Sequence, residues 1–268
     1  MTVTNKTDTP LTFNIYAADA FNTPDGGFSL RRRTDPKVDI AKWISLPVES
    51  ITVGPQALQE IPFSISAPAN ATSGDHPGGI VVEATQGPVN NNGALRVQTL
   101  QAVGTRIYAR VRGPVLPSLA VTQTHLAVHQ GVIGLLGGKV DADVTYTVVN
   151  TGNVRLTPKA IVEADPLIGS GKTLKPKDVP ELLPHGQATI REHVGSIWPF
   201  GRLTAHVTAS EAEVKAQGQG SQWVIPWLLI LVVIAIFGIW MYRRRRNPDA
   251  LEQPATGTPP RPREPVRA

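Results

Sequence analysis

The segment SGDHPGGIVV, residues 73–82, is the densest cluster of side chains in this chain that could do chemistry. It places an acid, Asp75, beside an imidazole, His76, among glycine and proline residues. Catalysis needs a second acid, base or nucleophile held nearby, and the sequence around this cluster supplies none. The glycines tolerate positive φ, and Pro77 keeps His76 extended. We therefore predict a loop between two strands, with ligand contact by Asp75 and His76 as the alternative.

The other candidate motifs fail on spacing. The histidines show no HExxH-type pattern; they stand at positions 76, 125, 129, 185, 193 and 206. In IGSGKT (168–173), Pro166 occupies the position where a phosphate loop needs its first glycine, and LKPKDVP cannot form the helix that should follow. Cysteine is absent, which excludes cysteine-based metal sites. We predict no catalytic residues, no metal ligands, no cofactor and no enzymatic activity.

One polar strip is a candidate for ligand binding. In TRIYARVRG, apolar residues alternate with four polar ones, Arg106, Tyr108, Arg110 and Arg112. On a strand these four side chains share one face, and guanidinium groups match the geometry of phosphate and carboxylate. The strip could hold an anionic wall polymer; the alternative is an ordinary exposed face. For RRR at 31–33 we expect a solvated hairpin.

Residues 223–242, WVIPWLLILVVIAIFGIWMY, predict a transmembrane helix that contacts the lipid bilayer. The segment carries no charge and has Trp223 and Trp227 near its start and Trp240 and Tyr242 near its end. Twenty residues at ~1.5 Å each reach ~30 Å, the thickness of a hydrocarbon core. Arg243–Arg246 follow at once. Because positive residues stay on the cytoplasmic side, we expect a single-pass protein of the cell membrane with an extracellular body and a cytoplasmic tail.

The basic charge of the chain belongs mainly to that tail. Residues 243–268 hold seven arginines and three acidic residues, whereas residues 1–222 hold 19 basic and 18 acidic side chains. A nucleic-acid-binding protein would carry its basic surface on the folded part, so we expect no nucleic-acid partner. The tail is basic, rich in proline and poor in apolar residues, which predicts disorder over 243–268.

The body predicts a mainly β fold made of two tandem immunoglobulin-like β-sandwich domains, followed by the one C-terminal transmembrane helix. Residues 140–148 alternate apolar and polar side chains, which is typical of a half-buried strand. Asn150 then starts a polar turn, and Asn5 occupies the matching place near the N-terminus. Short strands separated by turn signals recur throughout. We place the domains at 1–113 and 114–212 and a linker at 213–222.

The first copy of this pattern is short at its start. Four residues precede Asn5, whereas the second copy has two strand-like segments before Asn150. A sandwich without those strands would expose a sheet edge. We therefore expect roughly 25–30 further domain residues (from the repeat alignment) and a signal peptide ahead of Met1.

Several segments of the first domain resemble a known family. Trp43-Ile-Ser-Leu, IPFSISAPANATSGDHPGGIVV (61–82) and GTRIYARVRGP (104–114) are similar to the peptidoglycan-binding domain of WxL-interacting surface proteins of Gram-positive bacteria. The resemblance covers residues 1–113 well and the later domain by architecture. It implies a wall-binding β-sandwich, a second immunoglobulin-like domain, a transmembrane helix and a basic tail.

Together these patterns predict a non-catalytic, membrane-anchored surface protein. Its expected partners are peptidoglycan or an anionic wall polymer, and WxL-type or other surface proteins. The alternative is a chaperone-like module that offers a strand edge to partner proteins.

Overall fold

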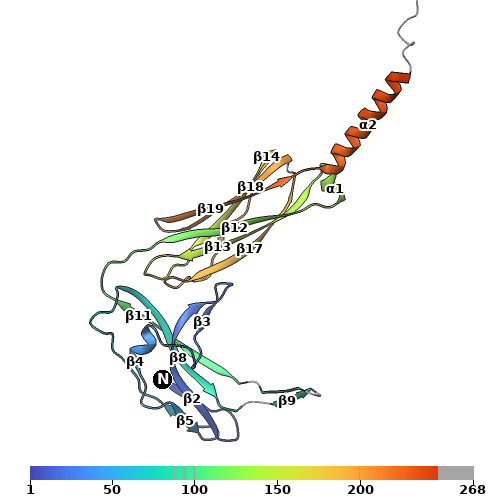
Figure 1. The fold of residues 1–268 in the computed structure, drawn as a ribbon. Coiled ribbons are helices and arrows are strands. Elements are labelled where there is room, and N and C mark those ends of the chain that lie inside the picture. Colours follow the sequence, from blue (N-terminus) through green and yellow to red (C-terminus); the bar gives the residue numbers. More distant parts are fainter. Residues whose placement is uncertain (87–88, 93–94, 99, 199, 247–268) are drawn as a thin grey trace, which may run out of the picture.

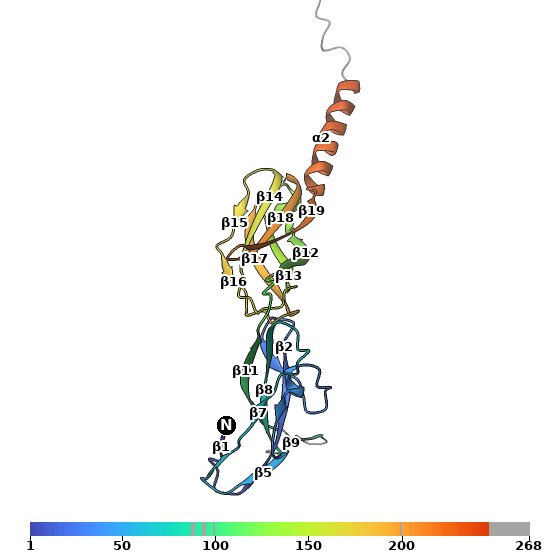
Figure 2. The ribbon, with the colours of Figure 1, turned by 90° about the vertical axis from the view of Figure 1, so that its left-hand side faces the viewer.

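The computed structural model describes residues 1–86, 89–92, 95–98, 100–198 and 200–246. Two β domains follow one another along the chain, and a single long helix extends from the second (Figure 1). Figure 2 shows the domains end to end, with the helix leaving the end of the second domain that lies away from the first. The predicted fold class, mainly β with two sandwich-like domains and one C-terminal apolar helix, is confirmed.

The first domain is built on one antiparallel sheet in the order β11-β8-β2-β3, with β5 also paired to β2. Three small pairs, β1 with β6, β4 with β7 and β9 with β10, complete it. Its elements are β1 (Thr2–Thr4), β2 (Leu11–Asn22), β3 (Phe28–Leu30), a 3-10 helix η1 (Ile40–Lys42), β4 (Ile44–Ser45), β5 (Ser50–Val53), β6 (Leu58–Glu60), β7 (Ser64–Ile65), β8 (Gly74–Ala84), β9 (Val89–Asn92), β10 (Leu95–Gln98) and β11 (Ala102–Val111).

One face of this sheet carries the main core of the first domain. Ile15 and Ile80 from the sheet pack against Val3 of β1, Ile40 of η1 and Ile44 of β4. The opposite face carries a much smaller cluster, in which Leu30 of β3 packs against Tyr16, Ala18 and Val81. The second layer of this domain therefore consists of short elements, which leaves parts of the sheet open.

The second domain has two facing sheets, in the orders β12-β13-β17 and β15-β14-β18-β19, with β16 paired to β14. Its elements are β12 (Leu119–His129), a short helix α1 (Val132–Leu135), β13 (Val140–Asn150), β14 (Lys159–Ile168), β15 (Lys172–Thr173), β16 (Lys177–Asp178), β17 (Gln187–Ile197), β18 (Phe200–Glu211) and β19 (Val214–Val224). The alternation predicted over 140–148 is confirmed, because its apolar members are at most 3% exposed: Val140, Ala142, Val144, Tyr146 and Val148.

The predicted end of the second domain and the linker at 213–222 are wrong. Glu213 lies in a turn, and residues 214–222 belong to β19, which pairs with β18 from Glu211↔Val214 to Gly201↔Val224. The many Gly, Gln and Ser residues suggested a linker, but Ala216 is buried and Val214 packs on the core. The final strand therefore completes the second domain.

The apolar helix α2 spans Trp227–Arg246, somewhat later than predicted, because Trp223 and Val224 belong to β19 and the four arginines belong to the helix. It has twenty residues, and none is buried in the protein. Its length and composition are sufficient to cross a membrane. The predicted disordered tail falls, apart from Arg243–Arg246, outside the described residues.

The match between Asn5 and Asn150 is confirmed in three dimensions. Asn5 is 1% exposed and donates to the carbonyls of Thr9, Val53 and Gly54. Asn150 is fully buried, donates to the carbonyls of Val154 and Leu182, and accepts from the amide of Gly152. Each side chain therefore fixes the same turn in its own domain.

Candidate functional site

Residues 74–79 of the predicted loop are instead the beginning of β8, whereas Ser73 lies just before the strand. Strand pairing with β11 runs without interruption from Gly74↔Val111 to Glu83↔Ala102. Gly78 and Gly79 serve close packing here: an added Cβ would lie 2.3 Å from a methyl carbon of Ile40 and 2.4 Å from the carbonyl oxygen of Thr105, respectively. Tertiary contacts thus override a composition that favours a turn.

His76 is a buried structural residue in this strand. It is 7% exposed, and its Nδ1 lies 2.7 Å from Oδ1 of Asp39. Its Nε2 lies 2.9 Å from the carbonyl oxygen of Thr72, and the ring packs against Trp43 at 4.5 Å between centroids. Both ring nitrogens therefore hold this part of the first domain together, although the ring borders a hollow of about 660 Å³ at the domain junction.

Asp75 connects the two domains. It accepts two hydrogen bonds from Arg110, at 2.5 Å from Nε and 2.9 Å from Nη2, and one at 3.0 Å from the backbone amide of Arg155 in the second domain. Burial alone would raise the pKa of Asp75, but these hydrogen bonds outweigh it and hold the pKa below its ordinary value. Asp75 is therefore ionised throughout the neutral range.

Tyr108 also serves the domain junction. Its hydroxyl donates to Oε2 of Glu181 at 3.0 Å, and the guanidinium of Arg155 lies over its ring, 4.3 Å from the centroid. Arg155 in turn pairs with Glu181 at 3.2 Å. Two members of the predicted polar strip, Tyr108 and Arg110, thus contact residues at the junction instead of standing free for a ligand.

Two asparagines extend the junction on either side of this network. Asn22 donates to the carbonyl of Glu181 at 2.8 Å and accepts from the amide of Leu183 at 2.9 Å. Asn153 donates to the carbonyls of Ser73 and Pro114 at 3.0 and 2.9 Å. The domains are therefore joined by directed hydrogen bonds as well as by the connecting chain.

The remaining two members of the strip separate from each other. Arg112 is exposed and follows the end of β11. The guanidinium of Arg106 lies over the ring of Phe28, 4.2 Å from its centroid. Arg106, Tyr108 and Arg110 lie at alternate positions of β11, as predicted, whereas Arg112 lies beyond its end. The four residues do not form one continuous cationic surface.

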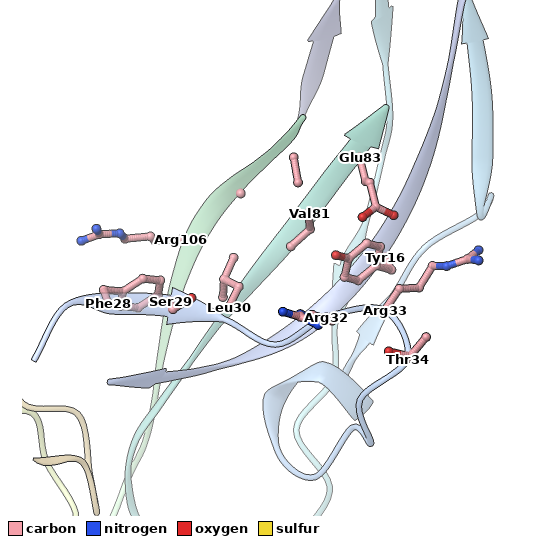
Figure 3. A pocket seen from close by; sticks show the side chains of 12 residues that line it. Tyr16, Phe28, Ser29, Leu30, Arg32, Arg33, Thr34, Val81, Glu83 and Arg106 are labelled. Atoms are coloured by element: carbon pink, nitrogen blue, oxygen red, sulfur yellow. The ribbon is translucent and has the colours of Figure 1, made fainter. Parts of the chain in front are cut away.

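Arg106 instead borders a hollow of about 690 Å³, which we call the arginine hollow. It is lined by Arg106 of β11, Arg32 and Arg33 of the segment after β3, Tyr16 of β2 and Glu83 of β8, among others (Figure 3). Within the described part of the chain, none of the three arginines forms an ion pair with a carboxylate. Burial, with a smaller contribution from Glu83, raises the pKa of Tyr16, so its phenol remains a hydrogen-bond donor at neutral pH. The hollow suits an anionic ligand.

The β11 strand forms an open sheet edge. Its only partner among the described strands is β8. The amide of Ala84 donates to the carbonyl of Gln101 at 2.9 Å, and antiparallel bonding alternates from that pair onward. The backbone N–H and C=O groups of Ala102, Gly104 and Arg106 therefore point away from β8.

An apolar groove of about 610 Å³ lies beside this edge, between β1 and the main sheet. Val103 borders the groove and is 72% exposed. Other apolar side chains, from the N-terminal residue and from strands β1, β2 and β8, also line it: Met1, Val3, Leu11, Phe13 and Val82. The sequence identified the residues of β11 but gave no indication of the groove, because its walls come from distant segments.

No family model and no curated protein matches this chain. The resemblance to WxL-interacting proteins therefore stays a prediction. Among solved structures, the chain is similar to the class 5 fimbriae chaperone CfaA, with a TM-score of 0.36, 13% identity, and coverage of 84% of this chain and 90% of that one.

The Pseudomonas aeruginosa chaperone CupB2 gives a TM-score of 0.33 at 10% identity, with 84% and 90% of the two chains covered. The E. coli chaperone DraB gives 0.32 at 12% identity, with 82% and 87% covered. TM-scores of this size do not bear on what the chain binds.

Proposed function

We propose that this chain is a non-catalytic binding protein, held in a membrane by α2, whose first domain offers the β11 edge to an extended segment of a partner protein. The observation that carries the proposal is the open edge of β11 beside an apolar groove. The positive charges of Arg243–Arg246 at the end of α2 support a cytoplasmic C-terminal side and two β domains outside the cell.

The edge and the groove together define the chemistry of the occupant. Outward-facing backbone groups at Ala102, Gly104 and Arg106 provide hydrogen bonds to any added strand, whatever its sequence. Since side chains alternate along a strand, every second residue of the occupant would enter the groove beside Val103 and Phe13. The partner segment is therefore extended and apolar at alternate positions.

Two substitutions test strand addition on the full chain in lipid nanodiscs, with a nine-residue peptide of alternating valine and threonine as the probe. Ala102→Pro removes an outward N–H without touching a bond to β8, and Val103→Glu places a charge in the groove. We expect each to weaken peptide binding about tenfold, equivalent to ~1.4 kcal/mol, in fluorescence anisotropy. The peptide should also slow hydrogen exchange at the amides of Ala102, Gly104 and Arg106.

Val38→Glu is the matched control, because Val38 lies in the same domain, is 60% exposed and does not border the groove. It should leave peptide binding unchanged. Equal binding by all variants, or a peptide that leaves exchange along β11 unaltered, would contradict strand addition.

The arginine hollow favours a second function, the binding of an anionic wall polymer or peptidoglycan. Exposed charge pairs contribute only ~0–1 kcal/mol each and are screened by salt, so several arginines must act together. The hollow supplies three, Arg32, Arg33 and Arg106, around one concave surface with a phenol donor. The predicted strip contributes Arg106 alone to this surface.

Retention on purified cell wall tests this second function. Changing Arg32, Arg33 and Arg106 together to serine should reduce the retained fraction about tenfold, if the three contacts sum to ~1–2 kcal/mol. Raised salt should have the same effect on the unaltered chain. The control removes equal charge elsewhere through Arg112→Ser, Lys175→Ser and Lys177→Ser, at exposed positions outside the hollow. Similar losses in both triple variants would argue against a specific site.

A further inference from the structure

Seven large apolar side chains are exposed on the second domain, and together they form what we call the apolar collar. Their exposed fractions range from 48% to 72%. The members are Val132, Ile133, Leu136, Leu167, Ile168, Trp198 and Trp223. Among the described residues from 119 to 224, these are the only exposed large apolar side chains. Their shared location therefore needs an explanation.

All seven lie at the end of the domain from which α2 emerges. The strand register places Ile168 opposite Phe200, and Gly201 opposite Val224, at this end. The indole N–H of Trp198 donates to the carbonyl of Gly137, just after α1, at 2.6 Å. A Cβ added to Gly137 would lie 3.2 Å from a methyl carbon of Leu229 in α2. Figure 1 shows α1 beside the beginning of α2.

The connection between domain and helix is very short. Only Ile225 and Pro226 separate β19 from α2. Two extended residues span at most ~7 Å, so the collar cannot move far from the surface of a membrane that α2 enters. The collar is continuous with the apolar helix, because Trp223, Ile225 and Leu229 line one shared apolar hollow.

We propose that the apolar collar is inserted into the interfacial layer of the same bilayer that α2 spans, so that the second domain rests directly on the membrane. The proposal depends on the membrane span included in the proposed function. Isoleucine, leucine and valine are stabilised by leaving water, and tryptophan is favoured at the level of the lipid headgroups. The lipid surface thus covers side chains that would otherwise form an exposed apolar patch.

Depth-dependent fluorescence quenching tests the collar. The chain has no cysteine, so single cysteines can be introduced without altering other positions. Ile133→Cys and Leu167→Cys, each carrying an environment-sensitive dye, are reconstituted as full chains in phosphatidylcholine–phosphatidylglycerol nanodiscs. We expect blue-shifted emission and strong quenching by lipids that carry a spin label near the headgroup, at a depth of about 5–10 Å.

Two further labels make the outcomes distinguishable. Glu213→Cys lies in the β18–β19 turn, at the opposite end of the same hairpin, and should show neither effect. Ile234→Cys lies in the middle of α2 and should be quenched by lipids labelled deep in the acyl chain. If Ile234→Cys is quenched while the collar labels behave like Glu213→Cys, the collar is outside the lipid and the proposal is wrong.

If Ile234→Cys is not quenched, the membrane span itself is wrong and the collar proposal falls with it. A blue shift at Ile133→Cys without lipid quenching would mean that protein covers the collar, which also overturns the proposal. A double variant, Val132→Asp with Ile168→Asp, should reduce lipid quenching at the Leu167→Cys label. Circular dichroism of that variant checks that the domain remains folded.

Discussion

Replacing Asn150 by alanine is expected to lower the free energy of unfolding of the second domain by about 3 kcal/mol. The side chain is fully buried and makes hydrogen bonds to the carbonyls of Val154 and Leu182 and from the amide of Gly152. Alanine would leave these backbone groups without a partner in a region that water does not reach. Urea denaturation followed by hydrogen exchange resolves the two domains and measures the loss.

The equivalent change in the first domain is the matched comparison. Asn5→Ala should destabilise the first domain by a similar amount and leave exchange in the second domain unchanged. Thr151→Ala, at an exposed position beside Asn150, should have an effect within about 0.5 kcal/mol. A loss below about 1 kcal/mol for Asn150→Ala would show that the turn does not depend on its asparagine.

Replacing Gly74 by alanine is expected to destabilise the domain junction by about 2–4 kcal/mol. Gly74 has φ of +120°, and an added Cβ would lie 2.2 Å from the backbone oxygen of Asn153 in the second domain. The same oxygen accepts the amide of Asp75 at 2.8 Å. Faster hydrogen exchange at the amides of Asp75 and Arg155 would report the separation, and the radius of gyration from solution scattering should increase.

Gly131→Ala is the control for the loss of a glycine as such. An added Cβ at Gly131 has no neighbour within 4 Å, and its φ of −76° is compatible with alanine. It should leave both measurements unchanged. A Gly74→Ala chain with native exchange at the junction would mean that the domains are held together by other contacts.

The β-sandwich architecture and the apolar helix could be predicted because each rests on a local pattern. Alternation over 140–148 reports which side chains face the core, and α2 carries no charge on any side from Trp227 to Tyr242. The paired turns at Asn5 and Asn150 were also predictable, since a buried asparagine fixing its own turn leaves a repeated polar signature. These features need no knowledge of distant residues.

The sequence failed where tertiary contacts override composition. Residues 74–79 read as a turn, yet their glycines are required because Ile40 and Thr105 approach the strand too closely for a side chain. Residues 213–222 were predicted as a linker and residues 223–224 as part of the membrane helix, although Val214–Val224 form a strand held by a full register with β18. In both segments, small residues reflect packing density instead of chain flexibility.

The candidate site was predictable in part. The alternation correctly placed three polar side chains, those of Arg106, Tyr108 and Arg110, at alternate positions of one strand. Asp75, however, lies 35 residues from Arg110 and 80 from the Arg155 amide. That separation hides the pairing that occupies Arg110. The arginine hollow was missed because Arg32 and Arg33 come to line the same hollow as Arg106 only when β3 folds back on β2.

The strand arrangement of the second domain also determines how it would respond to tension. Tension between a ligand on the first domain and a helix fixed in the bilayer would be applied to the second domain at two points. These are Leu119, the start of β12, and Val224, the end of β19. These points lie at opposite ends of the domain, because the β18–β19 turn faces the first domain. The load therefore runs along the strands, and the eleven residue pairs between β18 and β19 are sheared together. Paired strands that are loaded in shear must break their hydrogen bonds simultaneously. This domain is therefore arranged to transmit mechanical force without its strands separating one hydrogen bond at a time.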